Sequence, residues 1–276
     1  MRNPLTIATA VLLAVLAYSS VAVGQAAPPQ PAQGGANTLY GRLSGTGPGG
    51  PAPKRDFSGS WAGPLDAKLG DVPPMTPLGK ERFSANKPER QFHLSGSNDP
   101  FRTCDPFGFP RSVMNEVRGI AFATMPDRVV VLNQYQRVWR EIWTDGRELP
   151  KNVGGTEKGA PDPRYYGYSV GHWEGDYTFV VDTTGLDDRT WINSAGYPHS
   201  TNAHVQERWT RMDHNDLQLV VTLDDPAIYT KPFELTTDNF RWIPNQQLEE
   251  QLCVPSEMLD YIRIVGDPAG NGLPSN

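Results

Sequence analysis

The sequence predicts a mainly β protein that forms a single antiparallel β-barrel with one or two short helices. Short segments rich in Val, Ile, Phe and Trp follow one another at close spacing from residue 119 onward. Turn-type sequences separate these segments, and no long helix comes between them, which is the pattern of barrels and sandwiches. We favour the barrel because about eight strands in meander order can close without exposed edges. A β-sandwich is the alternative.

The first part of the chain has the composition of a secretory signal and a linker. Arg2, the apolar run at residues 5–18 and the small residues before Ala27 predict a signal peptide over residues 1–26. This run is shorter than the ~20 apolar residues of a transmembrane anchor. Residues 27–55 are rich in Pro, Gly, Gln and Ala and predict a disordered linker. We therefore expect a periplasmic or secreted protein with its β-barrel domain over residues 56–276.

Charge and cysteine content narrow the expected partners. The formal net charge is −6 and no basic cluster is present, so we expect no nucleic-acid partner. No later segment is apolar enough to span a membrane, and we expect a small-molecule ligand and no cofactor. The two cysteines, Cys104 and Cys253, are expected to pair in an oxidising compartment, with two free buried thiols as the alternative. The oligomeric state is not determined by the sequence.

The first elements of the domain have local signals. Gly59, Ser60 and Trp61 form a Gly-x-Trp, which is similar to the first strand of lipocalin-like barrels. Thr76 as an N-cap and Pro77 as the first helical residue predict a short helix over 76–83.

The remaining elements are predicted from β-rich runs and the turns between them. The period-2 pattern of a half-buried strand is present in residues 217–223, where Leu217, Leu219, Val221 and Leu223 alternate with Gln218, Val220 and Thr222. A helical turn is expected over 256–262. The predicted strands cover residues 119–124, 128–135, 139–144, 165–173, 177–183, 205–212, 217–223, 233–243 and 248–253.

Several longer motifs resemble a large family of exported bacterial proteins that mostly carry no assigned function. These motifs are NDPFRTCDPFGFPRSV, VWREIWTDGRELPK, YYGYSVGHWEGDYTFVVDTTGLDDRTW, PHSTNAHVQERW and DDPAIYTKPF. The resemblance covers nearly all of residues 56–268. It implies an exported, β-rich, lipocalin-like domain and implies no reaction. Tyr197 and Asn202 stand where small or acidic residues are more usual in that family.

The densest group of chemically active side chains lies in residues 195–209. His199, His204 and Glu207 fall within this stretch. A separation of five between the histidines fits neither the strand nor the helix spacing of metal ligands, so we predict no metal site. The G-x-S-x-G at residues 167–171 leads into another strand rather than a helix, so it is not expected to be a nucleophile elbow.

Glu207 is the leading candidate for acid–base chemistry. If residues 205–211 form a strand, Val205, Glu207, Trp209 and Arg211 share one face. Glu207 would then lie among apolar groups near Arg211, either as a tuned acid–base group with His199 as its partner, or as a structural ion pair.

Two functions follow from these residues. The preferred one is an exported barrel that binds a small amphipathic or hydrophobic molecule in its cavity. The alternative is an enzyme (a hydrolase, lyase or isomerase) on the same barrel that uses His199 and Glu207. The expected ligand-binding residues are His204, Arg211, Trp209, Trp191, Asp188, Arg189 and Trp173.

Overall fold

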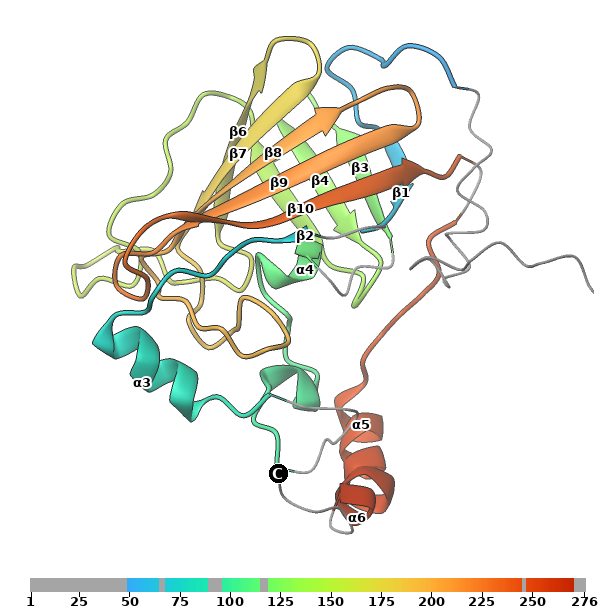
Figure 1. Ribbon diagram of the computed structural model, residues 1–276. Helices are drawn as coiled ribbons and strands as arrows, with labels where there is room; N and C mark the ends of the chain where they lie inside the picture. The colour runs from blue at the N-terminus through green and yellow to red at the C-terminus, as the bar shows by residue number, and fades with distance from the viewer. Residues whose placement is uncertain (1–48, 65–67, 89–95, 115–118, 245–246, 271–276) are drawn as a thin grey trace, which may run out of the picture. The chain divides into compact units, whose positions relative to one another are not determined.

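The computed structural model describes residues 49–64, 68–88, 96–114, 119–244 and 247–270, and the strands among them form a closed β-barrel (Figure 1). The predicted signal peptide and residues 27–48 of the predicted linker lie outside the described residues. The strands are β1 (Gly59–Ala62), β2 (Lys68–Leu69), β3 (Ile120–Thr124), β4 (Arg128–Asn133), β5 (Trp139–Trp143), β6 (Tyr168–Glu174), β7 (Thr178–Thr184), β8 (His204–Arg211), β9 (Asp216–Asp224) and β10 (Phe233–Trp242).

The barrel closes because β1 pairs with both β3 and β10. The order around the ring is β1-β3-β4-β5-β6-β7-β8-β9-β10, and β2 pairs with β10 as an additional short strand. The barrel predicted from the sequence is therefore confirmed over the sandwich. One pairing departs from the antiparallel meander, since β5 and β6 run parallel.

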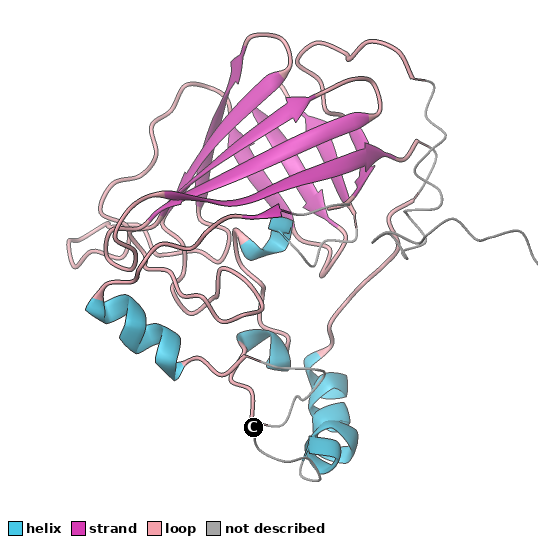
Figure 2. Cartoon of the chain, viewed as in Figure 1, coloured by secondary structure: helices cyan, strands magenta, loops and turns pink. Residues whose placement is uncertain are grey.

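Helices and loops gather beyond one end of the barrel (Figure 2). Only α3 and α5 are seven residues or longer, and the other helical segments of the described chain have four or five residues. The segments are α3 (Pro77–Ala85), the 3-10 helix η1 (Pro100–Thr103), α4 (Arg111–Met114), α5 (Pro255–Tyr261), the π-helix η2 (Ile262–Gly266) and α6 (Asp267–Gly270).

Helix α3 begins where the sequence predicted it. The Thr76 side chain accepts a hydrogen bond from the backbone N–H of Gly79 at 3.1 Å, and Pro77 occupies the first turn. The cap provides an acceptor for one of the N–H groups that have no partner at the start of a helix. Proline suits the first turn because it has no backbone N–H that would need an acceptor.

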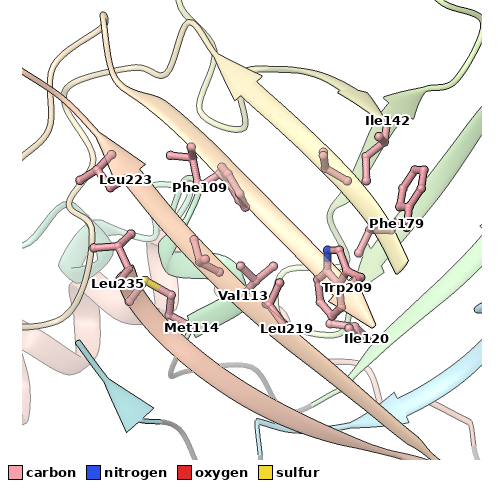
Figure 3. Close-up of a cluster of buried hydrophobic side chains, with 14 of the residues drawn as sticks. Phe109, Val113, Met114, Ile120, Ile142, Phe179, Trp209, Leu219, Leu223 and Leu235 are labelled. Atoms are coloured by element: carbon pink, nitrogen blue, oxygen red, sulfur yellow. The ribbon is translucent and has the colours of Figure 1, made fainter. Parts of the chain in front are cut away.

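Alternating side chains of the strands fill the barrel. In β9, Leu217, Leu219, Val221 and Leu223 are buried while the residues between them are only half-buried, as the period-2 pattern predicted. Figure 3 shows Leu219 near Trp209, with Leu223 farther along β9 among other side chains of the core.

One end of the core is completed by residues that precede β3. Phe109, Val113 and Met114 belong to the main hydrophobic cluster and are at most 1% exposed. They come from the turn-rich loop and α4, and Figure 3 shows them among the barrel strands. These side chains fill space inside the barrel. The sequence predicted the ligand cavity there.

The expectation of a strand over 248–253 is wrong. Of these residues only Gln251 makes a β-bridge, an isolated parallel one with Tyr135. The physical reason is that β10 already pairs with β9 on one side and with β1 and β2 on the other, so no edge is left for another strand. The chain instead continues past Cys253 into α5, the helical turn predicted near residue 256.

The described end of the predicted linker contacts the barrel. Lys54 forms an ion pair of 2.8 Å with Asp176, and the backbone N–H of Arg55 donates to the Asp176 carbonyl at 2.7 Å. Gly50 accepts a hydrogen bond from the backbone N–H of His214 at 3.1 Å. Residues 50–55 therefore lie along the turns of the β6–β7 and β8–β9 hairpins.

Cys104 and Cys253 form a disulfide, as predicted, with their Cα atoms 5.4 Å apart. The bond joins the loop between β2 and β3 to the segment after β10, across a sequence separation of 149 residues. A covalent loop of this length strongly restricts the unfolded chain.

We expect the Cys104→Ser/Cys253→Ser variant to lose about 3–5 kcal/mol of unfolding free energy, because its unfolded state regains the conformational entropy of the loop. Urea unfolding under non-reducing conditions measures the difference. Reductant should destabilise the wild-type protein to the same degree and leave the variant unchanged. Equal midpoints for the two oxidised proteins would contradict the expectation.

Candidate functional site

A pocket lies where β5 and β6 run parallel. The register joins only Ile142 with Ser169 and Trp143 with Val170. Next to this short pairing, the connection between the two strands folds back and encloses a pocket of about 660 Å³. We call it the seam pocket, and its wall consists of Trp139, Arg140, Glu141, Trp143, Arg147, Glu148, Leu149, Pro150, Pro163, Arg164, Tyr165, Tyr166, Gly167, Tyr168, Ser169, Val170, Asp187 and Arg189.

Aromatic side chains form much of this wall. Trp139 is the most exposed large hydrophobic side chain of the described residues, at 67%. It points out of the barrel because it alternates along β5 with the buried Arg140 and Ile142. A tryptophan left this exposed beside a pocket offers a large apolar surface to a ligand.

Guanidinium groups cover several of the other rings. Arg147 and Arg128 lie 3.4 and 3.7 Å from the Trp143 ring centroid. Arg164 lies 4.2 Å from the centroid of Tyr168. These cation–π contacts keep planar, hydrogen-bonding groups against the aromatic wall. The pocket therefore combines apolar surface with oriented polar donors.

Arg140 connects the seam pocket with the barrel interior. It belongs to the pocket wall, while its guanidinium donates to Glu207 of β8 and lies 4.1 Å from the centroid of Phe109. Glu207 is 0% exposed and also accepts a hydrogen bond from Trp209 Nε1 at 3.1 Å. Burial raises the pKa of Glu207, and the charge and hydrogen bond of Arg140 oppose that shift.

The Arg140–Glu207 pair answers the question that the sequence left open about Glu207. Val205, Glu207, Trp209 and Arg211 do share the buried face of β8, as the alternation predicted. The ion-pair partner of Glu207 is Arg140 from β5, however, and not Arg211. Arg211 instead donates to the carbonyl oxygens of Asp56, Asp213 and His214 and lies 4.7 Å from the centroid of Trp61.

We expect Glu207→Gln to destabilise the protein by about 3–5 kcal/mol, because Arg140 would remain buried without a charged partner. Replacing both residues, as in Arg140→Met/Glu207→Leu, should recover much of this loss, since no buried charge remains. Urea unfolding of Glu207→Gln measures its loss, and urea unfolding of the wild type, Arg140→Met, Glu207→Leu and the double variant measures the coupling. Additive losses would show that the two side chains do not act as a pair.

His199 is held in a different environment. It is 0% exposed, with Nε2 2.8 Å from Thr190 Oγ1 and Nδ1 3.2 Å from the Ser200 carbonyl oxygen. Burial lowers the pKa of His199. No contact among the described residues joins His199 to Glu207, so the structure does not bring together the acid–base pair considered from the sequence.

His204 lies on the outer face of β8. Its Nε2 is 2.9 Å from Asp182 Oδ1, and Gln206 Nε2 donates to the same oxygen at 3.1 Å. The hydrogen bond to Asp182 raises the pKa of His204, and the same bond lowers the pKa of Asp182. These residues form a half-exposed ion pair outside the seam pocket.

We expect His204→Gln to cost less than about 1 kcal/mol near pH 5.5 and nothing measurable near pH 9, because solvent screens the pair. The folded protein holds the His204 proton more tightly than the unfolded chain does. The stabilisation is therefore present below the unfolded pKa of about 6.5 and is lost as the pH rises through the folded pKa.

Urea unfolding at both pH values checks this expectation. In an Asp182→Asn background the same histidine substitution should lose its pH dependence, since the charged partner is gone. An equal cost of His204→Gln at both pH values would contradict it.

The other candidates fall into core and pocket positions. Trp173 packs against the rings of Phe57 and Phe179, and Trp209 against those of Phe122 and Phe240. The loop of residues 187–191 lies between two pockets. Arg189 contributes to the seam pocket and also to a neighbouring pocket of about 350 Å³, in whose wall Asp188 and Trp191 lie as well.

The described residues contain neither a candidate metal cluster nor a candidate membrane-spanning helix. No group of three or more His, Cys, Asp or Glu side chains in that part of the chain could hold a metal ion. Over the same residues, no helix is long and apolar enough to cross a membrane. Ser169 of the G-x-S-x-G lies in strand β6 and its hydroxyl is 2.8 Å from that of Thr183, as expected for a motif without an elbow.

The fold and the site together define a closed nine-stranded barrel with an aromatic and arginine-rich pocket at its one parallel seam. The comparisons with known proteins add no family to this class, because no family model, curated protein or solved structure matches the chain. The resemblance to exported bacterial proteins stays a prediction.

Most of the seam pocket is not predicted by the sequence. The expected cavity lay inside the barrel, whereas Trp139, Arg147, Arg164 and Tyr168 come from β5, β6 and the loop between them. A sequence signal was present, since RYYGYS places four aromatic or cationic side chains within six residues. The predicted strand over 165–173 includes Tyr165, Tyr166 and Tyr168, and Arg164 falls in the loop before it, so none of these residues has a role in the predicted site.

Proposed function

We propose that the protein is exported and binds a small amphipathic molecule in the seam pocket. The observation that carries the proposal is the pocket itself, whose volume of about 660 Å³ lies within the range of small-molecule sites. Its wall supplies apolar area through Trp139 and oriented donors through the stacked arginines. The barrel interior is a less suitable site because core side chains occupy it.

Export is supported by two independent features. Residues 1–26 have the composition of a secretory signal. The Cys104–Cys253 disulfide fits an oxidising compartment such as the periplasm or the extracellular space.

Binding is favoured over acid–base catalysis by the contacts of the two candidate catalytic residues. Glu207 is hydrogen-bonded to Arg140 and Trp209. His199 is hydrogen-bonded to Thr190 and Ser200. A general acid or base needs to reach its substrate and its partner, and these buried groups are engaged with structural neighbours.

We expect the exported, oxidised protein to bind the neutral fluorescent probe N-phenyl-1-naphthylamine, with Trp139→Ala weakening binding about 10-fold. A 10-fold weaker affinity corresponds to a loss of about 1.4 kcal/mol of binding free energy, which we attribute to the missing contact with the indole. Fluorescence titration measures the dissociation constants. Tyr177→Ala is the control, because Tyr177 is an exposed aromatic residue in the β6–β7 turn and outside the seam pocket.

Absence of probe binding to the wild type would contradict the proposed function. Equal weakening by Trp139→Ala and Tyr177→Ala would contradict the assignment of the site to the seam pocket.

A further inference from the structure

We infer that the ligand of the seam pocket carries a single carboxylate and that Arg164 binds this group. The inference rests on the proposed binding function and names the chemistry of its ligand. It starts from a difference among the arginines of the pocket wall, which are Arg140, Arg147, Arg164 and Arg189.

Three of these guanidinium groups already have a carboxylate partner. Arg147 is chelated by Asp145 through Nε at 2.9 Å and Nη2 at 2.6 Å. Arg189 is held in the same way by Asp187, at 2.9 and 2.5 Å. The third, Arg140, is paired with Glu207. A ligand anion would have to compete with an acidic side chain at each of them.

Arg164 differs because no ion pair or side-chain hydrogen bond engages its guanidinium within the described chain. Its contact there is the stacking on Tyr168 at 4.2 Å. Stacking leaves the edge of the guanidinium plane open, and this edge has the geometry that binds both oxygens of a carboxylate.

The position of Arg164 is fixed by its backbone and not by its side chain. Its N–H donates to the Gly185 carbonyl at 2.9 Å, and its carbonyl accepts from the N–H of Asp187 at 2.9 Å and from that of Gly167 at 3.0 Å. The ring beneath it is fixed as well, since the Tyr168 hydroxyl donates to the Asp162 carbonyl at 2.8 Å. The backbone of Arg164 and the ring of Tyr168 therefore hold the guanidinium in position before a ligand arrives, which lowers the entropic cost of binding.

The charges of the wall favour a monoanion. Arg140, Arg147 and Arg189 are neutralised by Glu207, Asp145 and Asp187. The two other carboxylates of the wall, Glu141 and Glu148, form ion pairs with Arg128 and Lys151. The single charge of Arg164 is left in excess. One carboxylate neutralises that excess, whereas a doubly charged phosphate would exceed it. The exposed indole of Trp139 supplies the apolar surface for the rest of the molecule.

The test compares 2-naphthoate with its neutral analogue 2-naphthamide by calorimetric titration of the exported, oxidised protein. We expect the wild type to bind 2-naphthoate at least 10-fold more tightly than 2-naphthamide. Arg164→Gln should remove this preference and leave 2-naphthamide binding unchanged, and that unchanged binding also shows that the pocket is intact. Arg164→Lys should retain part of the preference, because it keeps the charge and loses the planar fork.

Arg263→Gln is the charge-matched control, since Arg263 is 75% exposed and lies outside the seam pocket. It should leave both affinities unchanged. Equal affinities for the two probes, or a preference that survives Arg164→Gln, would overturn the inference while the proposed binding function stands. Failure of both probes to bind the wild type would overturn the proposed function and the inference together.

Discussion

The odd number of strands in the ring constrains the rest of this structure. Nine strands that close a ring cannot alternate in direction all the way round, so at least one neighbouring pair must be parallel. Eight pairs of this barrel are antiparallel, and the parallel pair is β5–β6. A parallel pair requires a long connection that returns along the barrel, and residues 144–167 provide it. The seam pocket forms between that connection and the two strands that it joins.

The same seam determines where charge can lie inside the barrel. Arg140 is on β5, directly beside the short β5–β6 pairing, and its guanidinium reaches Glu207 on β8. Its Nε and Nη1 have no hydrogen-bond partner among the described residues. A buried pair of this kind adds little net stability compared with apolar side chains, but it is costly to break. It links the core to the pocket wall, so the packing of β8 affects the geometry of the seam.

Local patterns in the sequence were sufficient to predict most elements of the fold. The cap at Thr76 and the alternation of Val205, Glu207, Trp209 and Arg211 are set by residues that are close in sequence. The pairing of Glu207 with Arg140 joins positions 67 residues apart, and nothing in the sequence around either residue indicates which residue is its partner. The seam pocket was missed for a similar reason, because it depends on which strands are neighbours and in which direction they run.

The disulfide has a consequence for the integrity of the chain. Strands β3 to β10 all lie between Cys104 and Cys253, so eight of the nine strands of the ring belong to one covalent loop. A protease that cut the long connection between β5 and β6 would leave two fragments that the sulfur–sulfur bond still holds together. Outside the cell, where such cuts are frequent, a nicked molecule would thus remain a single particle with its strands in place.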